Sequence, residues 1–461
     1  MKRSRYLGGV TAALALALAA TSCGGGRSST AAPSTTATVP ELRADQQVSI
    51  VLESYNLAQA GAWTDTFTDL INKFQSAHPN IKVTAQKPAT ATASGYGSAA
   101  AASIQRQIAA GKPPDIGQLG FGDLFYAVKG LGATPLDDVV GHDAVQATFG
   151  GTHPFAPTAR TLGDFDGKTY GIPFVFSTPI LYYNASLFTQ AGLDPAKPPA
   201  TWAEVKTAAL AIKSKAGKDG VYIDCLTKKA GDWCYQALVA SNGGSVLSAD
   251  RTRLTFAEAS AVEAVTMAQD LVQSGASPKL SQEQAYPAFA RGEIGMIVES
   301  SAGEAMFRKG ATGAKPPWDL RAGGLPSFDG KTVAPTNSGA ALVMFAKEPA
   351  KQRAAWEMIK FLTGDEGYIQ LTSKIGYLPL RTSLLDDPAG LKDWAAKNPL
   401  IKPNIDQLAR LRPTVAFPGD NYGQIRDTML DAVESVVYSG ADARSTLAAA
   451  ADRATKLLPK T

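Results

Sequence analysis

Histidine and cysteine are scarce in this chain, which has three of each in 461 residues. No C-x-x-C or H-x-x-x-H spacing occurs, so the paired ligands that hold zinc in many proteins are missing from the sequence. These absences exclude a metalloenzyme built on such ligands. We therefore expect neither a metal site nor a bound cofactor.

A strong net charge is also lacking. Lysine and arginine exceed aspartate and glutamate by four, and Lys2, Arg3 and Arg5 supply three of those four charges. Loss of the first residues would leave a net charge of +1, which is too small for binding nucleic acid through a basic surface. The hydrophobic fraction of 45% is too high for a disordered chain, and the length suffices for two large cores.

Residues 1–22 are typical of a signal peptide. Basic residues come first, an apolar run follows at 6–20, and small residues precede Cys23. The apolar run is too short to span a bilayer comfortably, and a buried core helix is the alternative interpretation. Residues 20–23 resemble a bacterial lipobox, with alanine where leucine is usual, which predicts a lipid on Cys23.

Residues 23–46 are predicted to be the lipidated cysteine and a flexible tether. The segment is rich in Gly, Ser, Thr, Ala and Pro and shows no hydrophobic periodicity. Random-coil scaling gives such a tether a mean reach of about 25–30 Å. We therefore expect the folded part to stand on the extracytoplasmic face of a bacterial cell membrane, attached through the lipid.

Cys225 and Cys234 fit the same compartment. They lie close together in the sequence CLTKKAGDWC, around a Gly-Asp pair that can turn, and an exported protein meets oxidising conditions. We expect a disulfide, which would contribute about 2–3 kcal/mol to stability in the chain-entropy model. Two independent buried thiols are the alternative.

From residue 46 onward, short apolar runs alternate with longer helical patterns, as in α/β proteins. Strands are expected at 48–52 and 81–85, after Asp115, and at 294–298 and 340–345. Helices are expected at 64–76, 99–110, 202–215, 257–274, 351–363 and 422–439. No internal repeat is visible.

Two extended segments suggest that the α/β fold is divided into two lobes. They lie at 171–176 and 295–301, and crossings at both would assemble each lobe from separated stretches of chain. Ligands of such paired lobes bind in the cleft between them, outside the carboxyl ends of the strands. The expected boundaries are 47–174 plus 297–345 for the N-terminal lobe and 175–296 plus 346–461 for the C-terminal lobe.

A set of short motifs lies downstream of the tether, and the pairing of STPILYYN with AGLDP is the specific part of it. The set comprises STPILYYN at 177–184, AGLDP at 191–195, Pro198-Pro199, Thr201-Trp202, NGG at 242–244, AFARG at 288–292, IGYLP at 375–379 and the helix around 430–437. Together these motifs resemble the extracellular solute-binding proteins of carbohydrate-type ABC importers, and within them the glycerol-3-phosphate-binding branch. The resemblance covers nearly the whole chain after the tether. It implies a two-lobe, periplasmic-binding-protein-like fold.

The resemblance also implies which residues bind the solute. A sugar or polyol has polar edges and flat CH surfaces, so hydroxyl groups and aromatic rings are suited to it. The positions that match cleft residues of the glycerol-phosphate branch are Tyr96, Ser177, Trp233, Ser300, Ser301, Gly339 and Tyr377.

Each of these residues also has a plainer role open to it. Trp233 either stacks on the ligand or covers the disulfide, and Tyr377 either points its hydroxyl into the cleft or packs between the lobes. Tyr96 stands between glycines, where a ligand contact and a plain flexible loop are both open. The serines either donate to the ligand or cap the backbone, and Gly339 either offers an amide or permits a turn.

The chain departs from the glycerol-phosphate branch at two places. Phe121 stands where the branch has an acidic residue that binds hydroxyl groups, so Asp123 and Gln118 are the candidate replacements. No arginine stands near 417–420, where the branch has one that binds phosphate, and this loss weakens the case for a phosphate ligand. The candidate replacements, each expected to be a solvated surface charge, are Arg381, Arg412 and Arg426.

The ligand is therefore expected to be a sugar, glycerol 3-phosphate or a glycerophosphodiester. Phe121, Phe176 and Trp233 would add aromatic surface, which also suits a choline cation. We expect a monomeric binding protein that delivers this solute to an ABC permease and catalyses no reaction.

The alternative is an exported hydrolase of cell-wall glycans. It would need paired carboxylates or an activated nucleophile, but no G-x-S-x-G motif is present and histidines are few. Single carboxylates such as Glu299 and Glu304 leave this alternative open, because carboxylate pairs meet in space rather than in sequence.

Overall fold

The computed structural model describes residues 38–59, 61–89 and 96–459, without the side chains of 96–98. The predicted signal peptide, Cys23 and the tether up to residue 37 lie outside the described residues. Within the described ranges, no helix has the length and apolar character needed to cross a membrane.

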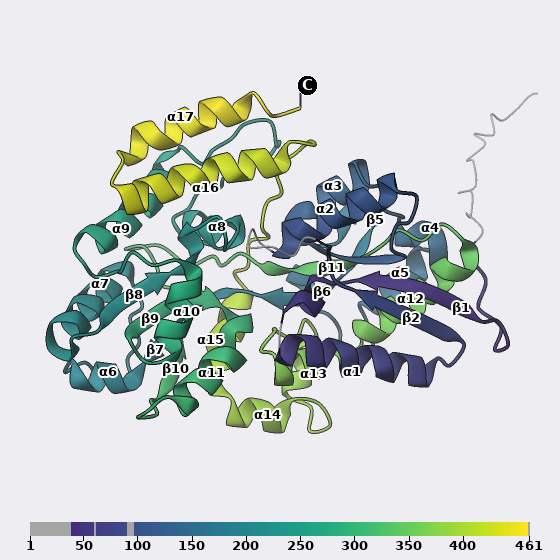
Figure 1. Cartoon of the computed structure of the whole chain (residues 1–461), viewed down its shortest axis with the longest axis horizontal. Coiled ribbons are helices and arrows are strands. Elements are labelled where there is room, and N and C mark those ends of the chain that lie inside the picture. The colour runs from purple at the N-terminus through teal and green to yellow at the C-terminus, as the bar shows by residue number, and fades with distance from the viewer. Residues whose placement is uncertain (1–37, 60, 90–95, 460–461) are drawn as a thin grey trace, which may run out of the picture. The chain divides into compact units, whose positions relative to one another are not determined.

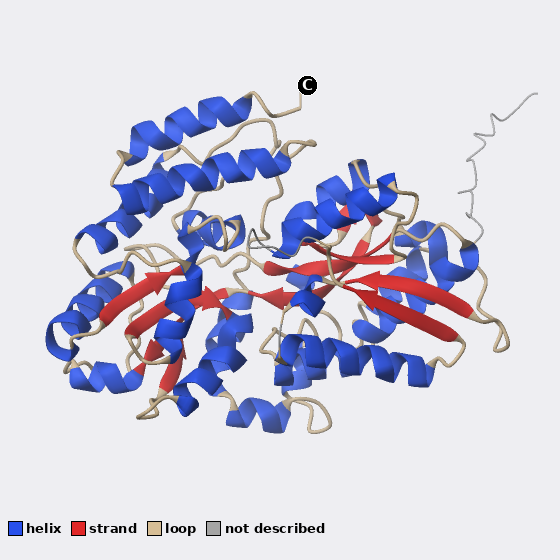
Figure 2. Cartoon of the chain, in the orientation of Figure 1, coloured by secondary structure: helices blue, strands red, loops and turns tan. Residues whose placement is uncertain are grey.

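Two β-sheets organise the described chain (Figure 2). The five-stranded sheet has the order β2-β1-β3-β11-β6, with β1 parallel to β2 and β3, and β11 antiparallel to β3 and β6. The four-stranded sheet has the order β10-β7-β9-β8, with β7 antiparallel to β9 and β10, and β8 parallel to β9. We call the part of the chain packed around the five-stranded sheet the N-terminal lobe and the part packed around the four-stranded sheet the C-terminal lobe.

The strands are short and mostly buried. In the five-stranded sheet they are β1 (Val48–Glu53), β2 (Ile81–Gln86), β3 (Ile116–Gly120), β6 (Gly171–Ser177) and β11 (Ser338–Met344). In the four-stranded sheet they are β7 (Pro179–Asn184), β8 (Asp219–Ile223), β9 (Ile294–Ser300) and β10 (Leu320–Gly323). A separate two-stranded ribbon contains β4 (Asp164–Phe165) and β5 (Lys168–Thr169).

Helices contact both sheets, as Figure 1 shows. Those against the five-stranded sheet include α1 (Ala62–Ala77), α2 (Tyr96–Ala109) and α12 (Pro349–Leu362), and those against the four-stranded sheet include α7 (Trp202–Ala211) and α10 (Gln282–Ala290). The others are α3 (Leu124–Lys129), α4 (Leu136–Val140), α5 (His142–Thr148), α6 (Ala185–Gln190), α8 (Asp232–Ser241), α9 (Ala259–Gln273), α11 (Glu304–Gly313), α13 (Asp365–Lys374), α14 (Lys392–Lys397), α15 (Lys402–Leu408), α16 (Tyr422–Ser439) and α17 (Ala443–Thr455).

The predicted strands and helices are all present. In α1 the buried residues Phe67, Leu70, Ile71 and Phe74 recur at the spacing of one helix face, which is why this segment packs as an amphipathic helix. The predicted alternation of strands and helices is confirmed.

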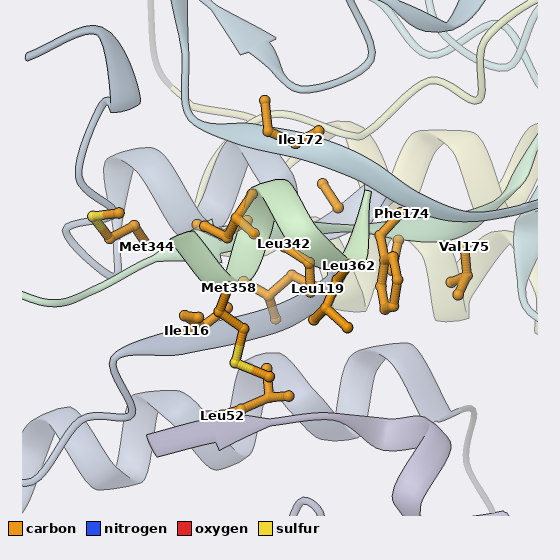
Figure 3. Close-up of a cluster of buried hydrophobic side chains, with 14 of the residues drawn as sticks. Leu52, Ile116, Leu119, Ile172, Phe174, Val175, Leu342, Met344, Met358 and Leu362 are labelled. Atoms are coloured by element: carbon orange, nitrogen blue, oxygen red, sulfur yellow. The ribbon is translucent and has the colours of Figure 1, made fainter. Parts of the chain in front are cut away.

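One part of the core of the N-terminal lobe lies between its sheet and α12. Figure 3 shows Met358 and Leu362 of α12 beside Leu52 and Ile116 of the sheet, and all four side chains are at most 2% exposed. Burial of large aliphatic side chains contributes about 1.5–3 kcal/mol each, so this cluster holds helix and sheet together.

The C-terminal lobe has apolar residues on both faces of its sheet. Because successive side chains of a strand point to opposite faces, Met296 and Val298 of β9 join one cluster while Ile297 joins the other. The sheet is therefore a central layer, and a strand such as β9 is apolar on both sides.

The second crossing between lobes lies elsewhere than predicted. Residues 295–301 were expected to cross, but they form most of β9 inside the C-terminal sheet, and β10 belongs to the same sheet. The chain instead returns to the N-terminal lobe between β10 and β11, over residues 324–337. A short apolar run fits a buried central strand as well as an extended crossing, so the sequence alone did not distinguish them.

The segment 346–461 also differs from the predicted boundary. Its first part, including α12 and α13, packs in the core of the N-terminal lobe, where Trp356, Ile359 and Tyr368 are buried. Only its later part, including α16 and α17, joins the core of the C-terminal lobe. Helix α12 is the next element after β11 in the chain, and its apolar face packs on the sheet to which β11 belongs.

Candidate ligand-binding site

Three of the predicted serines lie where the two lobes join. Ser177 ends β6 in the N-terminal lobe, and Ser300 ends β9 in the C-terminal lobe. The hydroxyl of Ser300 donates to the hydroxyl of Ser177 at 2.8 Å and also accepts from the backbone of Ala302 at 3.1 Å. The structure therefore brings these two side chains together and also gives Ser300 the capping role that was the plainer alternative.

Ser301 is the predicted serine with an unsatisfied side chain. Its backbone amide donates to Thr178 at 3.1 Å and its carbonyl accepts from the hydroxyl of Tyr182 at 3.1 Å. The side chain is 1% exposed, and its hydroxyl has no hydrogen-bond partner in the described structure. A buried hydroxyl without a partner costs free energy, which a bound ligand could offset.

The single residue between β6 and β7 is fixed by α15. The hydroxyl of Thr178 donates to Asn404 at 2.8 Å and accepts from Gln407 at 2.9 Å, and Gln407 also donates to the carbonyl of Pro179 at 2.8 Å. Thr178 is completely buried. These bonds fix the backbone that carries Ser177 and aligns it with Ser300.

A chain of neutral polar groups lies at the carboxyl ends of β1 and β3. The register of the two strands pairs Glu53 with Gly117, which brings Ser54 next to Gln118, and the Ser54 hydroxyl donates to the Gln118 amide oxygen. The Gln118 amide in turn donates to Asn56 at 2.5 Å. Gln118 was a candidate replacement for the missing acidic residue, and the structure instead gives both ends of its amide a protein partner.

Tyr377 joins this chain from a distant part of the sequence. Its hydroxyl accepts from the Asn56 amide at 3.0 Å, and the indole of Trp63 lies beside it. Burial raises the pKa of Tyr377 to about 12, so the hydroxyl stays protonated at physiological pH. The preceding Gly376 has φ of 107°, and a β-carbon there would lie 3.0 Å from the carbonyl of Ser301, so glycine permits a close approach to the C-terminal lobe.

Sequence reasoning missed Asn56, Ser54 and Trp63. Ser54 and Asn56 directly follow β1, and polar residues after the carboxyl end of a parallel strand are the signal that could have identified them. Trp63, in the first turn of α1, has no comparable signal in the sequence.

Phe121 and Asp123 occupy a short 3-10 helix after β3 and are both buried. Phe121 is 8% exposed and belongs to the core of the N-terminal lobe. Burial raises the pKa of Asp123, while a hydrogen bond from the Tyr422 hydroxyl at 2.7 Å and the nearby Arg426 oppose that effect. In this structure the Asp123 carboxylate is bound to the other lobe.

Trp233 lies in the first turn of α8 and is half-buried. Its indole nitrogen donates to the carbonyl of Ala230 at 2.8 Å, and its ring packs against the core of the C-terminal lobe. Its neighbour Cys234 is joined to Cys225 by the predicted disulfide, with 4.5 Å between the α-carbons. The exposed part of the indole leaves both of its predicted roles open.

Gly339 has a clear structural role. Its φ is 120°, and a β-carbon at this position would lie 2.0 Å from the carbonyl of Val175 in β6. The strands β11 and β6 also change register between Ala340 and Ala341. Glycine is therefore required for strand pairing here, which is neither of its two predicted roles, because Gly339 lies within β11 rather than in a turn.

Tyr96 begins α2, and its side chain lies outside the described part of the structure. Its predicted ligand contact stays a prediction.

The three candidate arginines differ in environment. Arg381 is 7% exposed and donates to the carbonyls of Thr363, Gly150 and Thr148, so it is a buried clamp rather than the solvated charge we expected. Arg426 is also mostly buried, beside Asp123, Asp232 and Asp427. Arg412 is exposed as predicted. The guanidinium groups of Arg381 and Arg426 are thus occupied by protein oxygens or faced by carboxylates.

A buried carboxyl pair lies at the ends of β8 and β9. Asp224 and Glu299 contact each other, and Asp224 also accepts from Gln282 at 2.9 Å and from the hydroxyl of Tyr286 at 3.2 Å. Burial raises the pKa of Glu299 well above its usual value, and the neighbouring Asp224 raises it further.

This pair does not match the geometry of a glycosidase. In such enzymes a sugar lies between the two carboxyl groups, which are about 5–9.5 Å apart, whereas Asp224 and Glu299 touch each other. Glu304, the other carboxylate considered, is paired with Arg308 of the same helix. Neither the pair nor Glu304 therefore supports the hydrolase alternative.

A surface hollow of about 660 Å³ lies elsewhere, on the N-terminal lobe. It is lined by residues 38–41 and by side chains of α4, α5 and α12, including Arg353 and Trp356. None of the predicted ligand-binding residues lines it.

Comparison with protein families gives one match over most of the chain. The model of a family described as bacterial extracellular solute-binding protein matches residues 69–402. The sn-glycerol-3-phosphate-binding periplasmic protein UgpB of Brucella melitensis is 29% identical over 295 residues, which are 61% of this chain and 66% of that protein. The chain thus spans slightly less than two thirds of the relative's length.

Solved structures with similar folds include two binding proteins. One is UgpB from Mycobacterium tuberculosis in complex with glycerophosphocholine, with a TM-score of 0.74, 22% identity and coverage of 88% of this chain and 98% of that one. The other is the cyclic α-maltosyl-1,6-maltose binding protein from Arthrobacter globiformis, with a TM-score of 0.71, 21% identity and coverage of 89% and 98%. The predicted two-lobe, periplasmic-binding-protein-like fold is confirmed.

Proposed function

Because the chain belongs to the family of bacterial extracellular solute-binding proteins, we propose that it is the substrate-binding lipoprotein of an ABC importer that captures a polyol-like solute. Its relatives and its fold are those of binding proteins, not enzymes, and an extracytoplasmic location follows from the family. The solute, the lipid anchor and delivery to the permease are the proposed parts.

The observation that carries the proposal is the meeting of hydroxyl groups from both lobes. Ser177 comes from the N-terminal lobe, Ser300 and Ser301 come from the C-terminal lobe, and the Ser301 hydroxyl has no partner in the described structure. A solute bound there contacts both lobes, so its binding stabilises the arrangement in which the lobes meet. Tyr377 and Trp233 are the proposed aromatic contributors.

The solute is proposed to be a sugar or a glycerophosphodiester in preference to a phosphate monoester. Arg426 is the candidate arginine that lies near Asp123, and it is already faced by Asp123, Asp232 and Asp427. A guanidinium that is neutralised by carboxylates binds a phosphate dianion poorly. Hydroxyl and amide groups suit an uncharged polyol instead.

Thermal unfolding in the presence of candidate solutes tests this proposal. The panel contains maltose and other sugars, glycerol 3-phosphate and glycerophosphocholine. A solute at 100 times its dissociation constant should add about 2.7 kcal/mol to the free energy of unfolding, which is a clear rise in melting temperature. The solute class is wrong if no panel member raises the melting temperature, and a rise with glycerol 3-phosphate alone contradicts the preference stated above.

A substitution at Ser301 tests the site itself. Ser301→Ala should weaken binding of the identified solute about 2- to 10-fold by calorimetry, the effect of losing one hydrogen bond. Ser383→Ala is the matched control, because the Ser383 hydroxyl also lacks a partner in the described structure but lies in the N-terminal lobe after α13. Equal affinities of the two variants would remove Ser301 from the site.

The lipid anchor and the partner permease need a separate test. A Cys23→Ala variant should appear in the soluble fraction of cells, whereas wild-type protein should sediment with membranes and support uptake of the solute. We propose that the mature protein is monomeric and that the tether allows it to reach the permease. Unchanged membrane association of Cys23→Ala would contradict the anchor but leave the solute site untouched.

A further inference from the structure

The lobes also contact each other at a second place, away from Ser177 and Ser300. The Tyr422 hydroxyl donates to Asp123 at 2.7 Å, and the rings of Tyr126 and Tyr422 lie 5.4 Å apart. The Arg251 guanidinium lies over the ring of Phe125 with 5.4 Å between them. Three separate contacts thus join α3 and the residue before it to the beginning of α16 and to the loop around residue 251.

The two sides of this contact belong to different cores. Leu124 and Ala127 of α3 are buried in the core of the N-terminal lobe, whereas Ile425 and Met429 of α16 are buried in the core of the C-terminal lobe. Each side is therefore fixed to its own lobe, so α3 and α16 separate when the lobes separate. A rotation that separates the lobes at this place must break the Asp123–Tyr422 hydrogen bond.

The charges around Asp123 come from the opposite lobe. Asp123 is 4% exposed, and Arg426, one turn after Tyr422 on α16, is the cation that faces it. Arg426 is also faced by Asp232, at the beginning of α8, and donates to Asp427 at 3.1 Å. A backbone hydrogen bond from Gly120 stays within the N-terminal lobe, but the hydroxyl donor and the cation that compensate Asp123 both belong to the C-terminal lobe, so separation of the lobes leaves the carboxylate with much less compensation.

We propose that Asp123 and Tyr422 form a closing latch, a contact between the lobes that stabilises the closed arrangement before any solute binds. Tyr422 and Arg426 are then positioning residues, and Asp123, which the sequence suggested as a solute ligand, acts through closure instead. The effect on solute affinity rests on the proposed function, whereas the effect on lobe closure does not.

The latch predicts a uniform effect on affinity. The apparent dissociation constant of a solute that needs the closed form is the intrinsic constant divided by the closed fraction. Loss of one charge-assisted hydrogen bond should lower that fraction, and so weaken binding, about 3- to 10-fold for every solute that binds. A direct contact between Asp123 and the solute would instead change the order in which solutes are preferred.

The experiment compares the full chain with Tyr422→Phe, Asp123→Asn and the double variant, by small-angle X-ray scattering without solute and by calorimetry with maltose and glycerophosphocholine. Tyr438→Phe is the matched control, since Tyr438 lies on the same helix with its hydroxyl near Asp224 of its own lobe. We expect a larger radius of gyration for both single variants, no further increase in the double variant, and equal loss of affinity for all solutes that bind.

Two results would overturn the latch. The first is a radius of gyration for Tyr422→Phe that equals those of wild type and Tyr438→Phe. The second is a change of solute preference in Asp123→Asn that Tyr422→Phe lacks, which would make Asp123 a solute ligand. Absence of binding by every solute would contradict the proposed function, while the scattering comparison would still decide the latch.

Discussion

The polar groups at the ends of the two sheets differ in kind. In the N-terminal lobe, Ser54, Gln118 and Asn56 form a chain of neutral hydrogen bonds that ends on Tyr377. In the C-terminal lobe, Asp224 and Glu299 place two carboxyl groups in contact, and burial raises the pKa of each. The neutral chain contains no carboxyl group, whereas the raised pKa values of the carboxyl pair favour its protonated form more than in ordinary carboxyl groups. One side of the lobe junction is thus fixed by amides and the other responds to pH.

Removal of the Gln118 amide, at the centre of the neutral chain, should have the largest effect on the free energy of unfolding. Gln118→Ala removes the acceptor of the Ser54 hydroxyl and the donor to the Asn56 amide oxygen, and it opens a cavity, so we expect a loss of about 2–4 kcal/mol in the free energy of unfolding. Urea denaturation measures it. Gln190→Ala, at the exposed end of α6, is the control and should change stability by less than about 0.5 kcal/mol. Similar midpoints for the two variants would show that the amide chain is dispensable.

The disulfide lies next to the carboxyl pair of the C-terminal lobe, because Cys225 directly follows Asp224 in the chain. Replacement of both Cys225 and Cys234 by serine should lower the free energy of unfolding by about 2–3 kcal/mol. In the chain-entropy model, this is the stabilisation that a disulfide closing so short a loop gives by restricting the unfolded chain. The measurement is urea denaturation of wild type with and without reductant, beside the double variant. Wild type with reductant should match the variant, and an effect of reductant on the variant itself would point to another cause.

The carboxyl pair should make stability depend on pH. A carboxyl group whose pKa is raised by folding keeps its proton when the unfolded chain has lost it, so stability falls as pH rises from the ordinary carboxyl pKa through the raised value. Glu299→Gln resembles the protonated form and should be more stable than wild type by about 1 kcal/mol or more at pH 8, with little difference at pH 4.

Glu263→Gln is the control for this prediction. Glu263 is exposed, and its hydrogen bond from Asn242 lowers its pKa, so its replacement should bring no gain at pH 8. Urea denaturation at both pH values gives the comparison. A Glu299→Gln variant less stable than wild type at pH 8 would mean that the pair is ionised and is stabilised by other groups.

Much of the fold could be predicted from local patterns. The buried face of α1 and the strands β1 and β2 follow directly from apolar spacing, because each of these elements buries one face. The place of β9 and α12 could not be predicted in this way, since an apolar run states that a segment is buried but not against which sheet.

The candidate site was predicted only in part, for a related reason. Ser177 and Ser300 were identified and do meet, but Asn56 was missed because its partner Tyr377 is 321 residues away in the chain. Asp123 shows the same limit, since its role depends on Tyr422 of the other lobe. Chemistry that depends on pairs of distant residues cannot be seen in a motif that covers only one of them.

The connection from β6 to β7 consists of one residue, Thr178, and this limits how the lobes can swing. A single residue has two soft backbone torsions, and both of its neighbours are held in strands. The Thr178 hydroxyl is bonded to both Asn404 and Gln407 of α15, so these torsions can change only if the hydrogen bonds break or α15 moves together with Thr178. Lobe opening is therefore expected to be a small-angle pivot, in which α15 acts as the stop that sets its amplitude.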